Sequence, residues 1–293
     1  MYRLPLGQWV NKGVEWLLNK YGHVIDAFST SIREIINALK DGLNIVPWWL
    51  LILIVMIVAW RARGWRLALG SGLGLLLIYD MLLWPAFLET LVLVIISAII
   101  SIAIGIPIGI IIARNNAINR IFTPLLDVMQ TMPSFVYLIP ALMFFGLGTV
   151  PAIFATVVFA MPPAIRLTDL GIRQVPKDLV EVGEAFGSTP SQMLWKIQLP
   201  LAMPTIMAGI NQTMMLSLSM VVVAGMIGAG GFGSGVLEGI SQMDIGKGFE
   251  NGLGVVILAM VLDRICQGFS QTARINKKQP VKKTFKKSFN NTV

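Results

Sequence analysis

Two glycine-rich segments have spacings that occur in nucleotide-binding proteins. Residues 228–233 read Gly-Ala-Gly-Gly-Phe-Gly and fit the G-x-G-x-x-G pattern, in which a helix N-terminus binds a dinucleotide pyrophosphate. That chemistry needs a preceding strand in a soluble βαβ unit, whereas this segment follows a long apolar run. Lys247 follows a glycine, but Gly248 stands where a phosphate-binding loop needs Ser or Thr. We therefore expect no cofactor in this chain.

Groups for catalysis or metal binding are scarce. His23 is the only histidine and Cys266 the only cysteine, which excludes an intramolecular disulfide and a cysteine metal cluster. No Ser/His/Asp arrangement can be assembled around His23 inside an apolar domain. We expect no catalytic residue and no metal site, and we do not expect the chain to be an enzyme.

The functional residues of this chain must be held in place by apolar helices. Of its 293 residues, 55% are hydrophobic and 13% are charged, whereas soluble domains carry about 25% charged residues. A membrane helix needs about 20 apolar residues, and only a helix satisfies its own backbone hydrogen bonds in lipid. The sequence predicts an all-α polytopic membrane protein. Its charge-free runs cover residues 42–60, 90–113, 128–165 and 197–237. About seven transmembrane helices are predicted, near 43–60, 67–84, 88–113, 124–145, 150–165, 201–225 and 250–271.

The basic residues indicate how the chain crosses the membrane. Lys and Arg follow the first, third, fifth and seventh predicted helices, and few lie in the other loops. Because cytoplasmic loops are enriched in Lys and Arg, the N-terminus is expected outside and the basic tail 273–293 inside. This topology explains the net charge of +8, and we expect no nucleic-acid partner. The tail is a solvated topology signal, or it contacts anionic lipid.

The N-terminal segment 1–42 mixes charged residues with apolar ones at roughly helical spacing. It is predicted to be an external or interfacial amphipathic helix. A solvated leader with little structure is the alternative.

The longest polar insertion between predicted helices, residues 166–200, begins with a short helix. Leu179, Val182 and Phe186 fall on one face of it, while Glu181 and Glu184 lie on another. A rigid surface helix with these faces is suited to docking on a soluble partner. A folded connecting loop without a partner is the alternative.

A second short helix is predicted after Gly187. Thr189 is its expected N-cap, Pro190 occupies the first helical position, and Gln192 completes a capping box. This helix is expected to end at Leu199-Pro200, before the next membrane helix.

The insertion resembles the coupling loop of permeases of ABC importers. Glu181, Gly187 and the pair Leu199-Pro200 match that motif, whereas Val182 and Gly183 stand in place of two alanines. The ATPase-coupling residues that the resemblance implies are Glu181, Val182, Gly183, Glu184, Ala185, Gly187, Leu199 and Pro200. The segments 130–133, 159–163, 174–176, 184–188 and 196–212 are similar to the glycine betaine and proline betaine permeases.

The resemblance implies a type I importer core over residues 88–272, preceded by two accessory transmembrane helices within 43–87. It implies a permease homodimer in a bacterial cytoplasmic membrane, two cytoplasmic ABC ATPase subunits that bind ATP and Mg, and an external substrate-binding protein. The expected function is ATP-driven import of quaternary ammonium compatible solutes in osmoprotection. Glycine betaine and proline betaine are the expected substrates, with carnitine and choline as further candidates.

Five polar residues within apolar helices are candidates for the translocation path, or for interhelical hydrogen bonds. They are Gln130, Thr131, Ser134, Asn211 and Gln212. An ion-gradient-driven secondary transporter or channel is the alternative function. It would favour ionisable groups at mid-membrane, whereas Glu89, Asp127 and Asp263 lie near predicted helix ends.

Overall fold

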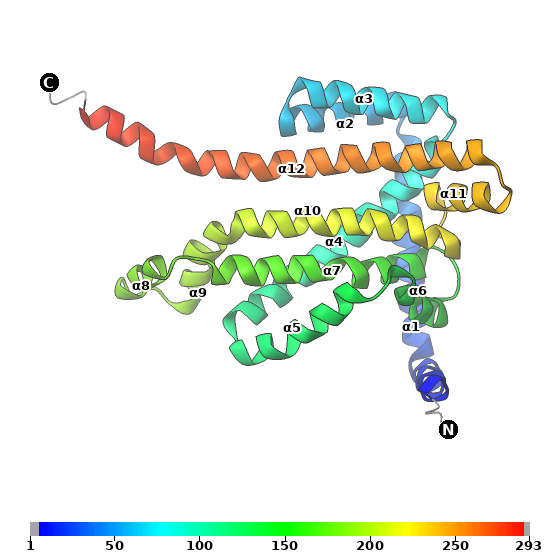
Figure 1. Cartoon of the computed structure of the whole chain (residues 1–293), viewed down its shortest axis with the longest axis horizontal. Coiled ribbons are helices and arrows are strands. Elements are labelled where there is room, and N and C mark those ends of the chain that lie inside the picture. Colours follow the sequence, from blue (N-terminus) through cyan, green and yellow to red (C-terminus); the bar gives the residue numbers. More distant parts are fainter. Residues whose placement is uncertain (1–5, 290–293) are drawn as a thin grey trace.

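The computed structural model describes the backbone of residues 6–289, and every regular element in that range is helical (Figure 1). Side chains are described from Gly7 to Gly268, except those of Gln8, Val10 and Phe28. The elements are α1 (Leu6–Ile45), α2 (Trp48–Arg63), α3 (Trp65–Asp80), α4 (Trp84–Arg114), α5 (Asn116–Thr131), α6 (Ser134–Phe145), α7 (Thr149–Arg173), α8 (Lys177–Ala185), α9 (Pro190–Gln192), a π-helical segment (Met193–Gln198), α10 (Leu199–Ala224), a 3₁₀ turn (Gly225–Ile227), α11 (Gly231–Ser241) and α12 (Ile245–Phe289).

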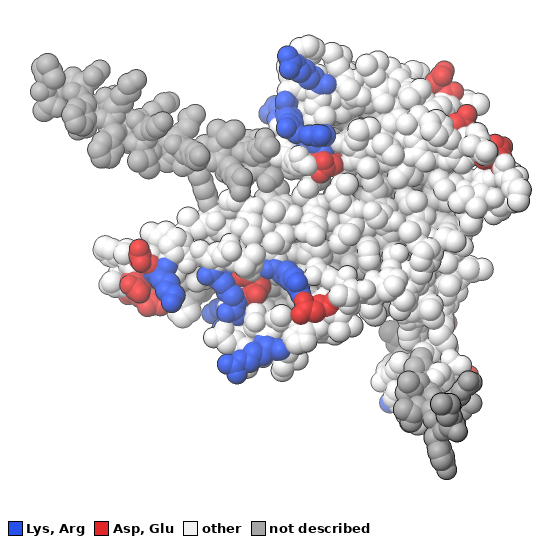
Figure 2. Space-filling view, viewed as in Figure 1, with Lys and Arg blue, Asp and Glu red and all other residues white. Residues whose placement is uncertain are grey.

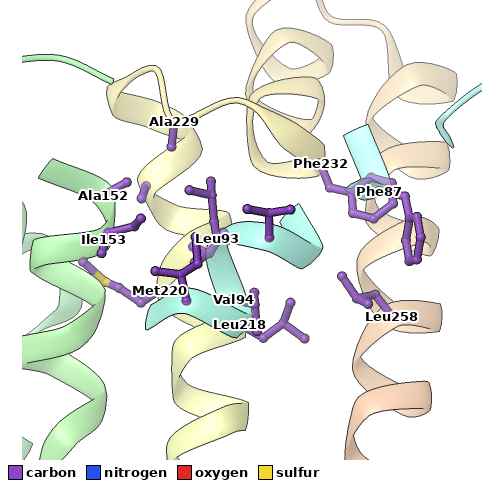
Figure 3. Close-up of a cluster of buried hydrophobic side chains, with 14 of the residues drawn as sticks. Phe87, Leu93, Val94, Ala152, Ile153, Leu218, Met220, Ala229, Phe232 and Leu258 are labelled. Atoms are coloured by element: carbon purple, nitrogen blue, oxygen red, sulfur yellow. The ribbon is translucent and has the colours of Figure 1, made fainter. Parts of the chain in front are cut away.

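Four long helices, α4, α7, α10 and α12, form the centre of the fold (Figure 1). Their apolar side chains meet in one large buried cluster near the end that also carries α11 (Figure 3). Phe87, Ile153, Met220, Phe232 and Leu258 each have 1% or less of their surface exposed. This cluster joins elements that are far apart in the sequence, so it fixes the ends of the helices relative to one another.

The expected all-α polytopic fold is confirmed, and the count of about seven spans stays a prediction. Within the described residues, four helices are long and apolar enough to cross a membrane, or six if each of two bent helix pairs counts as one span. The remaining predicted span corresponds to α3, which has 16 residues. At 1.5 Å per residue it is about 24 Å long, the same length as α2, which also has 16 residues.

The predicted helix 124–145 is wrong as a single element. It divides into α5 and α6, whose axes differ by 98°. Met132 between them has φ −69° and ψ 134°, which is an extended conformation. The cause is Pro133, because a proline ring disfavours the helical conformation in the residue before it.

Helix α1 covers most of the N-terminal segment and turns by 101° into α2. It runs across the ends of the long helices and contacts α4, α6 and α7 (Figure 1). Ile36 is fully buried against them, whereas Trp9, Trp16 and Val24 are more than half exposed. Its apolar surface therefore extends well beyond its contact with the bundle, and its interfacial location stays a prediction.

Candidate coupling site and polar path

Helix α8 stands at the end of the molecule opposite α11 (Figure 1). Its C-terminus is closed by two backbone hydrogen bonds, from Gly187 N–H to Glu184 O at 2.9 Å and from Ser188 N–H to Gly183 O at 3.0 Å. Gly187 has φ +72°, a left-handed conformation that glycine adopts without steric strain. The expected end of this helix at Gly187 is therefore confirmed.

Close packing at Gly183 holds α8 against the π-helical segment. A Cβ atom at this position would lie 2.7 Å from both Ile197 Cδ1 and Met193 Cε. The two atoms are the flexible ends of their side chains, so the contact excludes a large residue at this position rather than an alanine. The contact makes α8 and the start of α10 one rigid unit.

The capping box at the second short helix is confirmed. Thr189 Oγ1 accepts a hydrogen bond from Gln192 N–H at 3.3 Å, and Gln192 Oε1 accepts one from Thr189 N–H at 3.0 Å. The expected end of this helix at Leu199-Pro200 is wrong. The helix continues through the π-helical segment into α10, and Pro200 lies in the first turn of α10. Proline has no N–H to donate, so one hydrogen bond is missing at the junction of the π-helical segment and α10, but the helical turns continue across it.

The predicted apolar face of α8 is exposed. Phe186 is 87% exposed, and Val182 and Leu179 are about half exposed. Glu181 and Glu184 are also exposed, and Figure 2 shows acidic side chains gathered at this tip. A large unpacked aromatic residue beside carboxylates, on a helix held from behind, is suited to contact with another protein.

Three of the five candidate path residues lie together at the bend between α5 and α6. Gln130 and Thr131 end α5, and Ser134 begins α6. The Thr131 hydroxyl donates to Val128 O at 3.0 Å, while Gln130 is exposed. The bend thus places polar groups where a straight membrane helix would have continued.

The other two candidates lie on α10. Asn211 Nδ2 donates to Asp263 Oδ1 of α12 at 3.3 Å, and Asp263 also accepts from Gln267. Gln212 is exposed. Asn211 therefore makes an interhelical hydrogen bond, while Gln212 is the more accessible of the two.

The segment 228–233 forms a tight turn into α11. Gly231 N–H donates to Glu89 Oε2 at 2.7 Å, and Phe232 N–H donates to Thr90 Oγ1 at 2.9 Å. Gly230 and Gly231 have φ of +84° and +69°, and a Cβ on either would overlap Glu89 or Thr90. The glycines therefore allow the backbone at the start of α11 to lie close to the side chains of Glu89 and Thr90 on α4.

A line of polar contacts that was not predicted from the sequence joins α5 to α7. Asn119 Nδ2 donates to Asp169 Oδ2 at 3.0 Å. Arg173 Nη1 donates to Asn116 Oδ1 at 2.7 Å. The spacing of these residues along two helices could have indicated the contact, had the start of α5 been placed at Asn116.

Comparison with known proteins identifies the family. Residues 105–274 match the model of the binding-protein-dependent transport system inner membrane component family. The solved inward-facing structure of the MetNI methionine ABC transporter has a chain that aligns with a TM-score of 0.60 at 22% identity, covering 67% of this chain and 97% of that one. This likeness places the fold among the ABC importer permeases.

Curated relatives match over most of the chain. The glycine betaine transport system permease protein OpuAB of Bacillus subtilis is 47% identical, over 90% of this chain and 94% of its own length. The glycine betaine/proline betaine permease protein ProW of Escherichia coli is 44% identical, over 92% of this chain and 77% of its own length. The chain therefore belongs to the binding-protein-dependent transport system inner membrane components, the permease subunits of ABC importers, and its curated relatives include glycine betaine permeases.

Proposed function

We propose that this chain is the permease subunit of an ATP-driven importer of quaternary ammonium compatible solutes. Family membership and the names of its relatives support glycine betaine or proline betaine as the substrate, with carnitine and choline as further candidates. In this proposal the chain itself carries out no covalent chemistry. ATP and Mg bind to a separate ATPase chain.

The observation that carries the proposal is the exposed face of α8. Phe186 is 87% exposed and Val182 52% exposed, so the residues that the structure describes leave much of their apolar surface uncovered, next to the exposed carboxylates of Glu181 and Glu184. Gly183 locks the opposite side of α8 against Met193 and Ile197. A displacement imposed on α8 by an ATPase would therefore be carried directly into α10.

The proposed orientation puts α8 in the cytoplasm and α11 outside. Figure 2 supports it, because Lys and Arg gather around α5 and at the turn between α2 and α3, and the tip at α8 carries charges of both signs, whereas the side around α11 carries mainly acidic groups. The cytoplasmic end would then receive the two ATPase subunits, and the glycine turn before α11 would face the external binding protein.

The proposed transport cycle is alternating access in a pair of permease chains. ATP binding closes the two ATPase subunits and draws the two α8 helices together, which opens the path outward to accept substrate from the binding protein. Hydrolysis returns the pair to the inward state. Gln130, Thr131, Ser134 and Gln212 are the neutral polar groups proposed to line the path and to contact a zwitterionic betaine without binding it strongly.

Uptake by membrane vesicles tests this function. Right-side-out vesicles from cells that express this chain with its partners are loaded with ATP and given radiolabelled glycine betaine. We expect uptake that requires internal ATP and survives collapse of the ion gradients. Uptake that depends on a sodium or proton gradient without ATP would contradict the proposal and favour a secondary transporter.

A further inference from the structure

Polar residues form matching lines on α5 and α7. On α7 they recur at residues 166, 169 and 173, which is the i, i+3, i+7 spacing of one helix face. On α5 they recur at 116, 119 and 127, again along one face. The contacts run in antiparallel order, Asn116 with Arg173, Asn119 with Asp169, and Asp127 with Arg166. We call this set the α5–α7 polar seam.

Arg173 is the member of the seam that lies nearest to α8 in the sequence. It donates from Nε to Asp169 at 2.6 Å and from Nη2 to the Ile112 carbonyl of α4 at 2.9 Å. It is the last residue of α7, and residues 174–176 alone connect it to α8. A movement of α8 therefore reaches Arg173 before any other member of the seam.

There is space for such a movement. A cavity of about 310 Å³ lies between α8 and the ends of α4 and α7, lined in part by Ala113, Arg173, Val180 and Glu181. Helix α8 is packed tightly through Gly183 toward the π-helical segment but not on this side. The side of α8 nearest the seam is thus the one that can shift.

The central helices, in contrast, are joined by close apolar packing. A Cβ at Gly105 of α4 would lie 2.9 Å from Ala164 Cβ, and one at Gly109 would lie 2.6 Å from the Ile165 carbonyl of α7. A Cβ at Gly209 of α10 would lie 3.0 Å from Leu167 Cβ and 3.1 Å from the Pro163 carbonyl of α7. Separating α4, α7 and α10 would expose these contacts along their whole length, so the three move together.

Helix α5 is held much more loosely. Leu126 is its only fully buried side chain. The chain is extended at both of its ends, at Asn115 (φ −132°, ψ 110°) and at Met132. Figure 1 shows α5 as an outer arm beside α7 that is connected to the bundle at these two points. It can therefore change its angle without unwinding any helix.

The seam contacts are only partly buried. The Asp127 and Arg166 side chains are 56% and 37% exposed, Arg173 is 34% exposed and Asp169 is 19% exposed. Exposed ion pairs contribute about 0–1 kcal/mol each because water replaces the lost partner, whereas one buried aliphatic side chain contributes about 1.5–3 kcal/mol. The seam can therefore hold α5 in a defined place and still release it.

We propose that the α5–α7 polar seam is a releasable contact through which the coupling helix controls the position of α5, with Arg173 as the positioning residue. The inference rests on the proposed function. Displacement of α8, which is packed on the start of α10, shifts the end of α7 that carries Arg173 relative to Asn116 of α5. The seam opens from that end, and α5 swings on its two extended joints. The swing carries Gln130 and Thr131, at the far end of α5, into or out of the path.

A reversible crosslink across the seam tests this directly. Cys266→Ser removes the only native thiol, and Asn119→Cys with Asp169→Cys then allows a short, membrane-permeant, reducible bis-thiol reagent to join α5 to α7. We expect the crosslink to lower ATP-dependent uptake of radiolabelled glycine betaine at least tenfold, with recovery after reduction. Co-purification of the ATPase subunits should be unchanged, since the exposed face of α8 is untouched.

A matched crosslink controls for nonspecific effects of the reagent. Glu238→Cys with Lys247→Cys allows the reagent to join α11 to α12, because Glu238 Oε1 and Lys247 Nζ lie 2.6 Å apart in the native protein. This crosslink should leave uptake within twofold of the uncrosslinked protein. Asp127→Cys with Arg166→Cys serves as a second seam pair should the first fail to assemble. If the crosslinked seam still transports within twofold of the reduced protein, the proposal is overturned.

The same experiment separates this inference from the proposed function. Before crosslinking, uptake must require internal ATP. Uptake that does not require ATP at that stage would contradict the importer assignment. Normal ATP-dependent uptake that persists in the crosslinked vesicles would contradict only the release of the seam.

Discussion

The carboxylate of Glu89 accepts a hydrogen bond at 2.7 Å from the backbone N–H of Gly231, 142 residues later in the chain. Its other oxygen, Oε1, forms a salt bridge with Lys40 Nζ, also at 2.7 Å. One side chain of α4 thus joins α1 to the N-terminus of α11. A negative charge is favourable there, because the free N–H groups and the helix dipole make that end positive.

Glu89→Gln tests this junction. The amide can still accept the hydrogen bond from Gly231 but loses the ion pair with Lys40 and the charge at the helix end. We expect the free energy of unfolding to fall by about 1.5–3 kcal/mol, the range for hydrogen bonds to charged groups. Thermal unfolding of the purified protein measures this change. Adding Lys40→Met should cost little more, since both changes remove the same contact; fully additive losses would contradict the pairing.

Gly231→Ala should be strongly destabilising. The left-handed backbone costs a residue with a Cβ about 1–2 kcal/mol, and the new methyl group would also overlap Thr90 Oγ1. We expect a loss of at least about 2 kcal/mol in the same unfolding measurement. Gly252→Ala is the control, because nothing lies within 4 Å of its Cβ position and alanine favours a helix by about 1 kcal/mol. Equal stability of the two variants would refute this explanation of the turn.

Substitutions at Gly183 should distinguish the effect of side-chain size on ATPase binding from the effect of helix propensity. Alanine gains about 1 kcal/mol of helix propensity and touches only the flexible ends of Ile197 and Met193, so ATPase co-purification should stay within about twofold. Leucine cannot be accommodated and should displace α8, with an overpacking cost of about 1–3 kcal/mol and a loss of binding of about tenfold. The assay is the amount of ATPase retained on the tagged permease. A leucine variant that binds as wild type would show that α8 is not held at this contact.

The turn between α11 and α12 should respond to acid. The hydrogen bond and charge of Lys247 hold the pKa of the Glu238 carboxyl below its ordinary value. A lowered pKa means that the pair stabilises the fold above the ordinary value of about 4.3 and is lost as the pH falls through the lower, folded-state pKa. We expect amide hydrogen exchange near the turn to accelerate there beyond its intrinsic pH dependence. Glu238→Gln should show reduced protection already at pH 7, and equal protection at pH 7 would contradict the role of the pair.

Much of this fold follows from local sequence patterns. The apolar runs predict the long helices α4, α7, α10 and α12, and the Thr189–Gln192 capping box is confirmed. These features depend on residues within a turn or two of one another. Pro133 also indicates the bend at Met132. The bend was not predicted, because Pro133 lies inside an apolar run that is typical of a continuous membrane helix.

The remaining features depend on contacts between distant segments. The fit of Gly183 against Met193 and Ile197 and the bond from Gly231 to Glu89 cannot be inferred from spacing along one helix. The α5–α7 polar seam requires both the start of α5 and its antiparallel alignment with α7. Residues 116–127 were therefore interpreted as a loop and the beginning of a membrane helix, and their shared face was missed.

Binding of the ATPase to the exposed tip of α8 tests the central claim most directly. Phe186→Ala removes an aromatic side chain that is 87% exposed, and Phe249→Ala removes one that is 68% exposed at the opposite end of the molecule. An aromatic anchor contributes 2 kcal/mol or more to an interface, which corresponds to over about 20-fold in affinity. We expect Phe186→Ala, and likewise Glu181→Lys, to reduce ATPase co-purification and ATP-dependent uptake together, while Phe249→Ala retains the ATPase. Full retention of the ATPase and full uptake in both the Phe186 and Glu181 variants would contradict the account.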